Sequence, residues 1–108
     1  MSKSALEAEL ALQIRALGLP EPVREYQAIT GRKFRFDFAW LENRLLVEVN
    51  GGTYTKGAHS TGQGIARDYE KANLATLDGW RVLMFDGKAV KSGEAVETIR
   101  KALEAKNG

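Results

Sequence analysis

Residues 33–50 read K-F-R-F-D-F-A-W-L-E-N-R-L-L-V-E-V-N, and this stretch decides the fold. Over residues 33–40 apolar and polar side chains alternate, which is the period of a β-strand with one buried face. The aromatic row expected on that buried face is Phe34, Phe36, Phe38 and Trp40, and the row on the opposite face is Lys33, Arg35, Asp37 and Ala39. The polar segment L-E-N-R separates this strand from a second apolar run, so the stretch predicts a β-hairpin.

The register of the hairpin follows from the same pattern. We place Glu42 and Asn43 in a two-residue turn. This turn sets three apolar pairs opposite each other on one face: Phe36 with Val49, Phe38 with Val47, and Trp40 with Leu45. A slip of one residue would bring Glu48 and Asn50 into the aromatic row, which the burial of that face forbids.

The predicted register places Asp37 directly opposite Glu48, with the Cβ atoms about 4.5–5.5 Å apart. Two like charges at that spacing need a raised pKa, a basic side chain or a bound cation. Carboxylate and carbonyl oxygens suit Mg²⁺, so Asp37, Glu48 and the Val49 carbonyl form a candidate metal site. The alternative is that Glu48 pairs with Arg35 or Lys71 on a solvated sheet face.

The other periodic segments complete the layout. We expect helices over residues 4–17, 64–78 and 92–103, a loop or short strand over residues 23–29, and a strand over residues 80–85. Ser4 is the expected N-cap of the first helix. The inward side of the middle helix is expected to carry Ile65, Tyr69, Ala72 and Thr76. The predicted fold class is α/β, a mixed β-sheet with a core antiparallel hairpin, flanked by helices, whose last strand joins by a crossover.

Composition narrows the classes of protein and site. The 108 residues predict one domain over residues 1–108, and the absence of cysteine excludes disulfides, thiolate zinc sites and a cysteine nucleophile. With a single histidine, a metal must rely mainly on oxygen ligands. No stretch approaches the roughly 20 apolar residues of a membrane span, and the N-terminus lacks a signal-peptide pattern, so we expect a cytoplasmic protein. The net charge of +2 leaves room for an anionic partner if the basic residues cluster.

Three segments carry a family resemblance: F-D-F-A-W at residues 36–40, L-V-E-V-N-G-G-T at residues 46–53, and D-Y-E-K-A-N-L-A-T-L-D-G-W-R-V-L-M-F at residues 68–85. The chain resembles, over nearly its whole length, the small Vsr-like branch of the PD-(D/E)XK nuclease superfamily of bacteria and phages. The superfamily pattern falls on Asp37 and Glu48, with Asn50 at the position of the usual lysine. The resemblance suggests Lys71 as a lysine supplied from the neighbouring helix and Glu7 as the typical first-helix acid.

Each of these residues has an ordinary structural explanation as well. Glu7 lies three positions after Ser4, which is the spacing of a capping box. Lys71 can be a solvated lysine, and His59 can be a plain loop residue rather than a base or a phosphate contact. Asn50 can orient a water or contact DNA, but it does not carry the charge of a lysine.

The resemblance implies a Mg²⁺-dependent DNA endonuclease, with Mn²⁺ able to substitute, that nicks DNA or resolves branched DNA such as a Holliday junction. Basic and loop residues are expected to contact phosphates: Arg32, Lys33, Arg35, Lys56, His59 and Arg67. Junction-cutting relatives commonly act as dimers, so a homodimer is implied. The alternatives are a catalytically inactive nucleic-acid-binding module with the same fold and a dimerising accessory protein.

Overall fold

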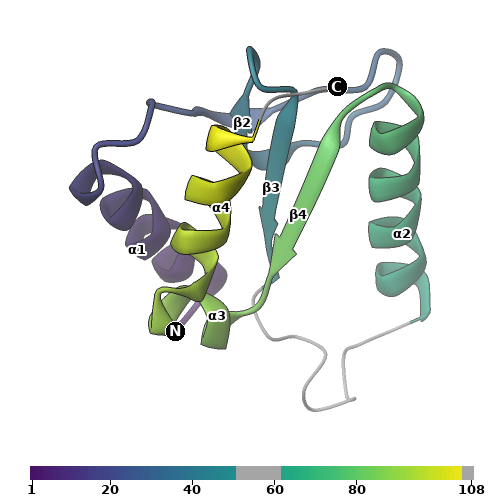
Figure 1. Cartoon of the computed structure of the whole chain (residues 1–108). Helices are drawn as coiled ribbons and strands as arrows, with labels where there is room; N and C mark the ends of the chain where they lie inside the picture. The colour runs from purple at the N-terminus through teal and green to yellow at the C-terminus, as the bar shows by residue number, and fades with distance from the viewer. Residues whose placement is uncertain (51–61, 106–108) are drawn as a thin grey trace.

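The computed structural model describes residues 1–50 and 62–105. Along the chain these form α1 (Lys3–Ala16), β1 (Val23–Tyr26), β2 (Phe36–Trp40), β3 (Leu45–Val49), α2 (Gly62–Leu77), β4 (Arg81–Phe85), α3 (Gly87–Ser92) and α4 (Glu94–Glu104). The strands form one sheet in the order β1-β2-β3-β4, in which β3 and β4 run parallel and the other neighbours antiparallel (Figure 1). The predicted α/β class, the hairpin and the crossover to the last strand are confirmed.

Helices cover both faces of the sheet. On one face lie α1, α3 and α4, and on the other lies α2 (Figure 1). The larger core cluster, between the sheet and the three helices, includes Leu10, Ile14, Phe38, Val47 and Ile99. The smaller cluster, beneath α2, contains Phe36, Ala39, Leu46, Ala75 and Trp80. Among residues 1–50 and 62–105, no helix is both long and apolar enough to cross a membrane.

The hairpin register is confirmed over three pairs: Phe38 with Val47, Ala39 with Leu46, and Trp40 with Leu45. The connection is longer than predicted, because residues 41–44 all lie in the turn. The Arg44 amide donates to the Leu41 carbonyl at 3.1 Å, and Arg44 has a φ of +50°. A four-residue turn therefore preserves the register that a two-residue turn was expected to set.

The prediction of an uninterrupted strand over residues 33–40 is wrong at its N-terminal end. The strand begins at Phe36, which packs against the α2 cluster, whereas Phe38 packs on the opposite face. The regular ladder gives way at Asp37, whose amide donates to Glu48 Oε1 at 3.2 Å, while the Val49 amide donates to Asp37 Oδ2 at 2.7 Å. Two carboxylates thus take over backbone bonds, and the aromatic row is split between the two faces.

The side of the middle helix that was predicted to be apolar is only partly buried: Ala72 is half-buried, and the side chain of Ile65 lies outside the described part of the chain. Lys71 and Ala75 are buried, whereas Tyr69 is 67% exposed and Thr76 is also exposed. Ala75 belongs to the smaller core cluster, and Lys71 has a buried acidic partner. The buried side of α2 therefore carries a charged residue, Lys71, as well as the apolar Ala75.

The C-terminal helical region begins earlier than expected. The short helix α3 follows Asp86, whose side chain accepts from the Ala89 amide at 2.9 Å as an N-cap. In α4, Val96 and Ile99 are buried as predicted, and Leu103 packs against the core.

The N-cap of α1 is Ser2, not Ser4, because Ser2 Oγ accepts a hydrogen bond from the Ala5 amide at 3.1 Å. This removes the capping-box explanation of Glu7, which depended on Ser4. We expect Ser2→Ala to lower the free energy of unfolding by about 1 kcal/mol. Ser4→Ala, which leaves the cap in place, should change it far less. Urea denaturation of both variants checks this, and a larger loss in Ser4→Ala would contradict the assignment.

Candidate functional site

The site is built around Asp37, which is only 4% exposed and lies where the regular ladder between β2 and β3 gives way. Its Oδ2 atom accepts hydrogen bonds from the Val49 amide at 2.7 Å and from Lys3 Nζ at 2.7 Å. The Val49 carbonyl accepts from the same Lys3 ammonium at 2.9 Å. One carboxylate and one strand carbonyl therefore meet at a single positive charge.

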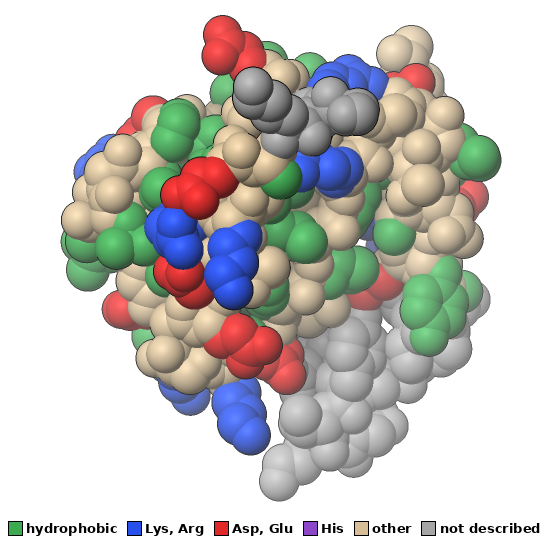
Figure 2. Space-filling model, viewed as in Figure 1, with side chains coloured by type: hydrophobic (Ala, Val, Ile, Leu, Met, Phe, Trp, Pro, Cys, Tyr) green, Lys and Arg blue, Asp and Glu red, His purple; other side chains and the backbone are tan. Residues whose placement is uncertain are grey.

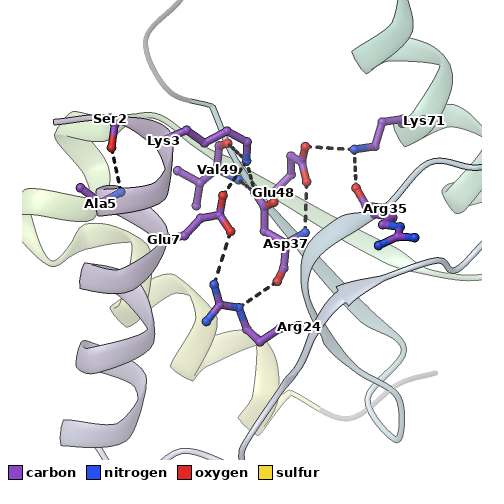
Figure 3. A network of polar contacts seen from close by, with 10 residues as sticks. All are labelled: Ser2, Lys3, Ala5, Glu7, Arg24, Arg35, Asp37, Glu48, Val49 and Lys71. Carbon is purple, nitrogen blue, oxygen red and sulfur yellow. Dashed lines mark hydrogen bonds and ion pairs between the residues drawn. The ribbon is translucent and has the colours of Figure 1, made fainter.

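Lys3 brings this charge from the first turn of α1. Besides Asp37 and the Val49 carbonyl, its ammonium contacts Glu7 Oε2 at 3.1 Å, one helical turn further along α1 (Figure 3). An ammonium has three donors, and three oxygens receive them here. Partial burial alone would lower the pKa of Lys3, but the hydrogen bond and the negative charge of Asp37 raise it overall. The lysine is thus a cation held by oxygen atoms of the kind that Mg²⁺ prefers.

A third acid stands beside Glu7 and Asp37. Glu7, Glu25 and Asp37 can bring one carboxylate oxygen each to within 4.8 Å of one another. Glu25 has a φ of +53°, in the left-handed region that a residue other than glycine seldom adopts. Such backbone strain is often found at functional sites.

Arg24 joins this group from β1. Its guanidinium donates to Glu7 Oε1 at 3.4 Å and to the Asp37 carbonyl at 3.3 Å, and it lies 4.5 Å from the Phe38 ring centroid. Glu7 consequently lies between two cations, Lys3 and Arg24 (Figure 3).

Glu48 turns to a different lysine. Lys71 Nζ, from α2, lies 2.9 Å from Glu48 Oε2, donates to the Arg35 carbonyl at 2.7 Å, and is 4.6 Å from the Phe36 ring centroid. Both members of the ion pair are buried, so Glu48 does not lie on a solvated sheet face and Lys71 is not a solvated lysine. The two neighbouring carboxylates therefore each have a lysine of their own: Lys3 from α1 for Asp37, and Lys71 from α2 for Glu48.

Burial raises the pKa of Glu48 above its ordinary value of 4.5, and the charge of Asp37 raises it further, against the opposing effect of Lys71. The folded protein then holds this proton more tightly than the unfolded chain does. Stability from this group is present below pH 4.5 and is lost as pH rises through the folded-state pKa. As pH rises from 4.5 through the folded-state pKa, we expect the free energy of unfolding of the wild type to fall relative to that of Glu48→Gln. Urea denaturation at several pH values measures it. Parallel stability curves would contradict the raised pKa.

The remaining predicted residues lie as follows. Asn50 follows β3 and is half-buried, and its backbone amide donates to the Phe85 carbonyl at 2.8 Å. Arg32 pairs with Glu70 at 2.9 Å. Three further basic residues are exposed, namely Lys33, Arg35 and Arg67, while Lys56 and His59 lie outside the described residues.

Charges of both signs intermingle on the face of the molecule that carries α4 (Figure 2). There Arg100 pairs with Glu97 and Glu104. This mixed surface does not present the concentrated positive charge that a nucleic-acid backbone attracts. The exposed basic residues Lys33, Arg35 and Arg67 lie on other parts of the chain, just before β2 and in α2.

The sequence did not identify Lys3, Arg24 or Glu25 as members of the site. The one available signal was the spacing of Lys3 and Glu7, since residues four apart lie on the same side of a helix. The placing of Glu25 depends on a positive φ, and that of Arg24 on the pairing of β1 with β2.

No family model matches the chain, and no curated protein does. Among solved structures, the catalytic domain of the homing endonuclease I-Bth0305I is similar, with a TM-score of 0.67 and 18% sequence identity. The match covers 90% of this chain and 91% of that domain. The chain therefore has a fold that is also found in a nuclease catalytic domain.

Proposed function

We propose that the protein is a DNA endonuclease that hydrolyses phosphodiester bonds with Mg²⁺, for which Mn²⁺ can substitute. The observation that carries this proposal is the meeting of Glu7, Asp37 and the Val49 carbonyl at one cation, beside the buried Glu48–Lys71 pair. The likeness of the fold to a homing endonuclease catalytic domain supports it.

The oxygens around Lys3 are suited to a divalent metal. Asp37, Glu48 and the Val49 carbonyl would hold the ion, with the carboxylate of Glu7 beside Asp37. These oxygen atoms are hard ligands of the kind that Mg²⁺ prefers, and the Lys3 ammonium, itself a cation, already lies among them. When bound, Mg²⁺ supplies the charge that polarises the scissile phosphate and activates the attacking water.

We assign Lys71 the part of the superfamily's strand lysine. Its ammonium is fixed by Glu48 and by the Arg35 carbonyl, so it reaches the site from α2 although Asn50 occupies the strand position. A buried ammonium at this point can position a water or offset the negative charge that develops on the phosphate. Asn50 is left to orient a water or to contact DNA.

The protein is proposed to nick DNA or to resolve branched DNA such as a Holliday junction. The basic side chains near β2 and α2 suit phosphate contacts, which position a nucleic acid without reading its sequence. We propose Arg32, Lys33, Arg35 and Arg67 as phosphate contacts on this surface. Lys56 and His59, which lie outside the described residues, are proposed as further contacts from the sequence alone. A homodimer would supply two sites for the two strands of a junction, and light scattering would test it.

The test is a cleavage assay of the purified chain on supercoiled plasmid, linear duplex, single-stranded DNA and a four-way junction. We expect cleavage with Mg²⁺ or Mn²⁺ and none with EDTA, with a preference for the plasmid or the junction. DNA binding without metal-dependent cleavage of any substrate would overturn the enzyme and indicate the inactive binding module. Mn²⁺ should also raise the melting temperature of the wild type and not of Glu48→Ala, because a ligand that binds the folded state stabilises it.

A further inference from the structure

We infer that Lys3 is a built-in competitor of the metal, whose ammonium occupies the ion position in the metal-free protein and leaves it when a divalent cation binds. This inference rests on the proposed function, because it concerns the metal of the same site. It assigns a role to a residue that lies outside the nuclease motif.

The first argument is that Lys3 and the metal need the same oxygens. The ammonium contacts Asp37 Oδ2 at 2.7 Å, the Val49 carbonyl at 2.9 Å and Glu7 Oε2 at 3.1 Å. Mg²⁺ requires its oxygens at about 2.0–2.1 Å and is surrounded by them. Two cations cannot share one position among three oxygens, and their charges repel each other. Binding of the metal and this placement of Lys3 are therefore mutually exclusive.

The second argument is the contrast between the two lysines of the site. The Lys71 side chain is 11% exposed, packs against the Phe36 ring and donates to the Arg35 carbonyl. Its departure would leave the buried carboxylate of Glu48 without a partner. The Lys3 side chain is 44% exposed and extends from the first residue of α1. Its head can therefore move into water, where an ammonium is well hydrated, while the helix stays in place.

Competition of this kind predicts a definite effect on metal affinity. While the ammonium occupies the position, that fraction of the molecules cannot bind the ion, and the apparent dissociation constant rises in proportion. If Lys3 is in place about nine-tenths of the time, removing it tightens metal binding about tenfold. In the metal-free protein the same contact neutralises Asp37 and keeps the ligands together.

The experiment measures Mn²⁺ binding by titration calorimetry for the wild type and three variants. We expect Lys3→Met to bind about tenfold more tightly, and Lys101→Met, which removes an exposed lysine of α4, to match the wild type. Arg24→Gln is the control for charge alone, because it removes a cation that contacts Glu7 without vacating the ion position. Equal tightening in Arg24→Gln, or none in Lys3→Met, would overturn the competition.

A second measurement follows Lys3 itself. Brief acetylation of the wild-type protein, read by mass spectrometry, reports how free each lysine amine is. Addition of Mg²⁺ should increase the labelling of Lys3 relative to Lys101. Unchanged or reduced labelling of Lys3 would mean that it stays with the ligands and would overturn the inference.

The two proposals fail in distinguishable ways. If the chain cleaves DNA with Mg²⁺ but neither affinity nor labelling changes as described, the nuclease stands and the competition falls. If neither the wild type nor Lys3→Met binds Mn²⁺, both are overturned.

Discussion

Asp37→Asn is expected to slow DNA cleavage by about 10³-fold, because a single electrostatic group that stabilises the transition state contributes about 10²–10³-fold in rate. The asparagine oxygen can still accept from the Val49 amide, as Asp37 Oδ2 does at 2.7 Å. The substitution therefore removes the negative charge that attracts a cation while it keeps the shape of the strand. Cleavage of supercoiled plasmid at saturating Mg²⁺ is the measurement.

Asp78→Asn is the matched control, because it makes the same change of charge at an exposed aspartate that follows α2. It should cleave like the wild type. Circular dichroism should show both variants folded, and Mn²⁺ should no longer raise the melting temperature of Asp37→Asn. Cleavage by Asp37→Asn within a few fold of the wild type would exclude Asp37 as the residue that holds the metal.

The hairpin could be predicted from the sequence because its apolar residues show directly which side chains must be buried. The pairing of Phe38 with Val47 and of Trp40 with Leu45 follows from a pattern that only one register buries. The same reasoning failed at Phe36, where the ladder is interrupted because the Asp37 and Glu48 carboxylates accept hydrogen bonds from backbone amides. Those bonds depend on side chains meeting in three dimensions, and an alternating pattern contains no sign of them.

The candidate site divides in the same way. The residues of the nuclease motif were found from the hairpin register and the family resemblance, and Lys71 was already a candidate partner of Glu48. Lys3, the partner of Asp37, was not found. Lys3 reaches Asp37 across 34 positions of sequence, and Lys71 reaches Glu48 across 23. Local spacing cannot reveal such contacts, and on α2 it favoured Tyr69 over Lys71 as the inward residue. The side of α2 that faces the sheet instead carries Lys71, in a buried ion pair with Glu48.

The second large effect is expected at Lys71. Lys71→Met should lower the free energy of unfolding at pH 7 by about 3 kcal/mol or more, because it leaves the buried Glu48 carboxylate without its partner. The double variant Glu48→Gln/Lys71→Met should recover most of this loss, since two neutral side chains of similar size replace the pair. Urea denaturation of the wild type, both single variants and the double variant gives the coupling energy. Additive losses would mean that the pair contributes little.

Cleavage separates the structural part of Lys71 from its catalytic part. A purely structural lysine would leave the activity of Lys71→Met proportional to the folded fraction, so an assay well below its melting temperature would restore the wild-type rate. We expect instead a loss of about 10²-fold per folded molecule, while Mn²⁺ still stabilises the variant because Asp37, Glu48 and the Val49 carbonyl remain. Lys101→Met, an exposed change of the same kind, should cleave normally. If the double variant regains stability but does not cleave DNA, the fold tolerates the loss of the buried ion pair. Cleavage of the phosphodiester bond does not.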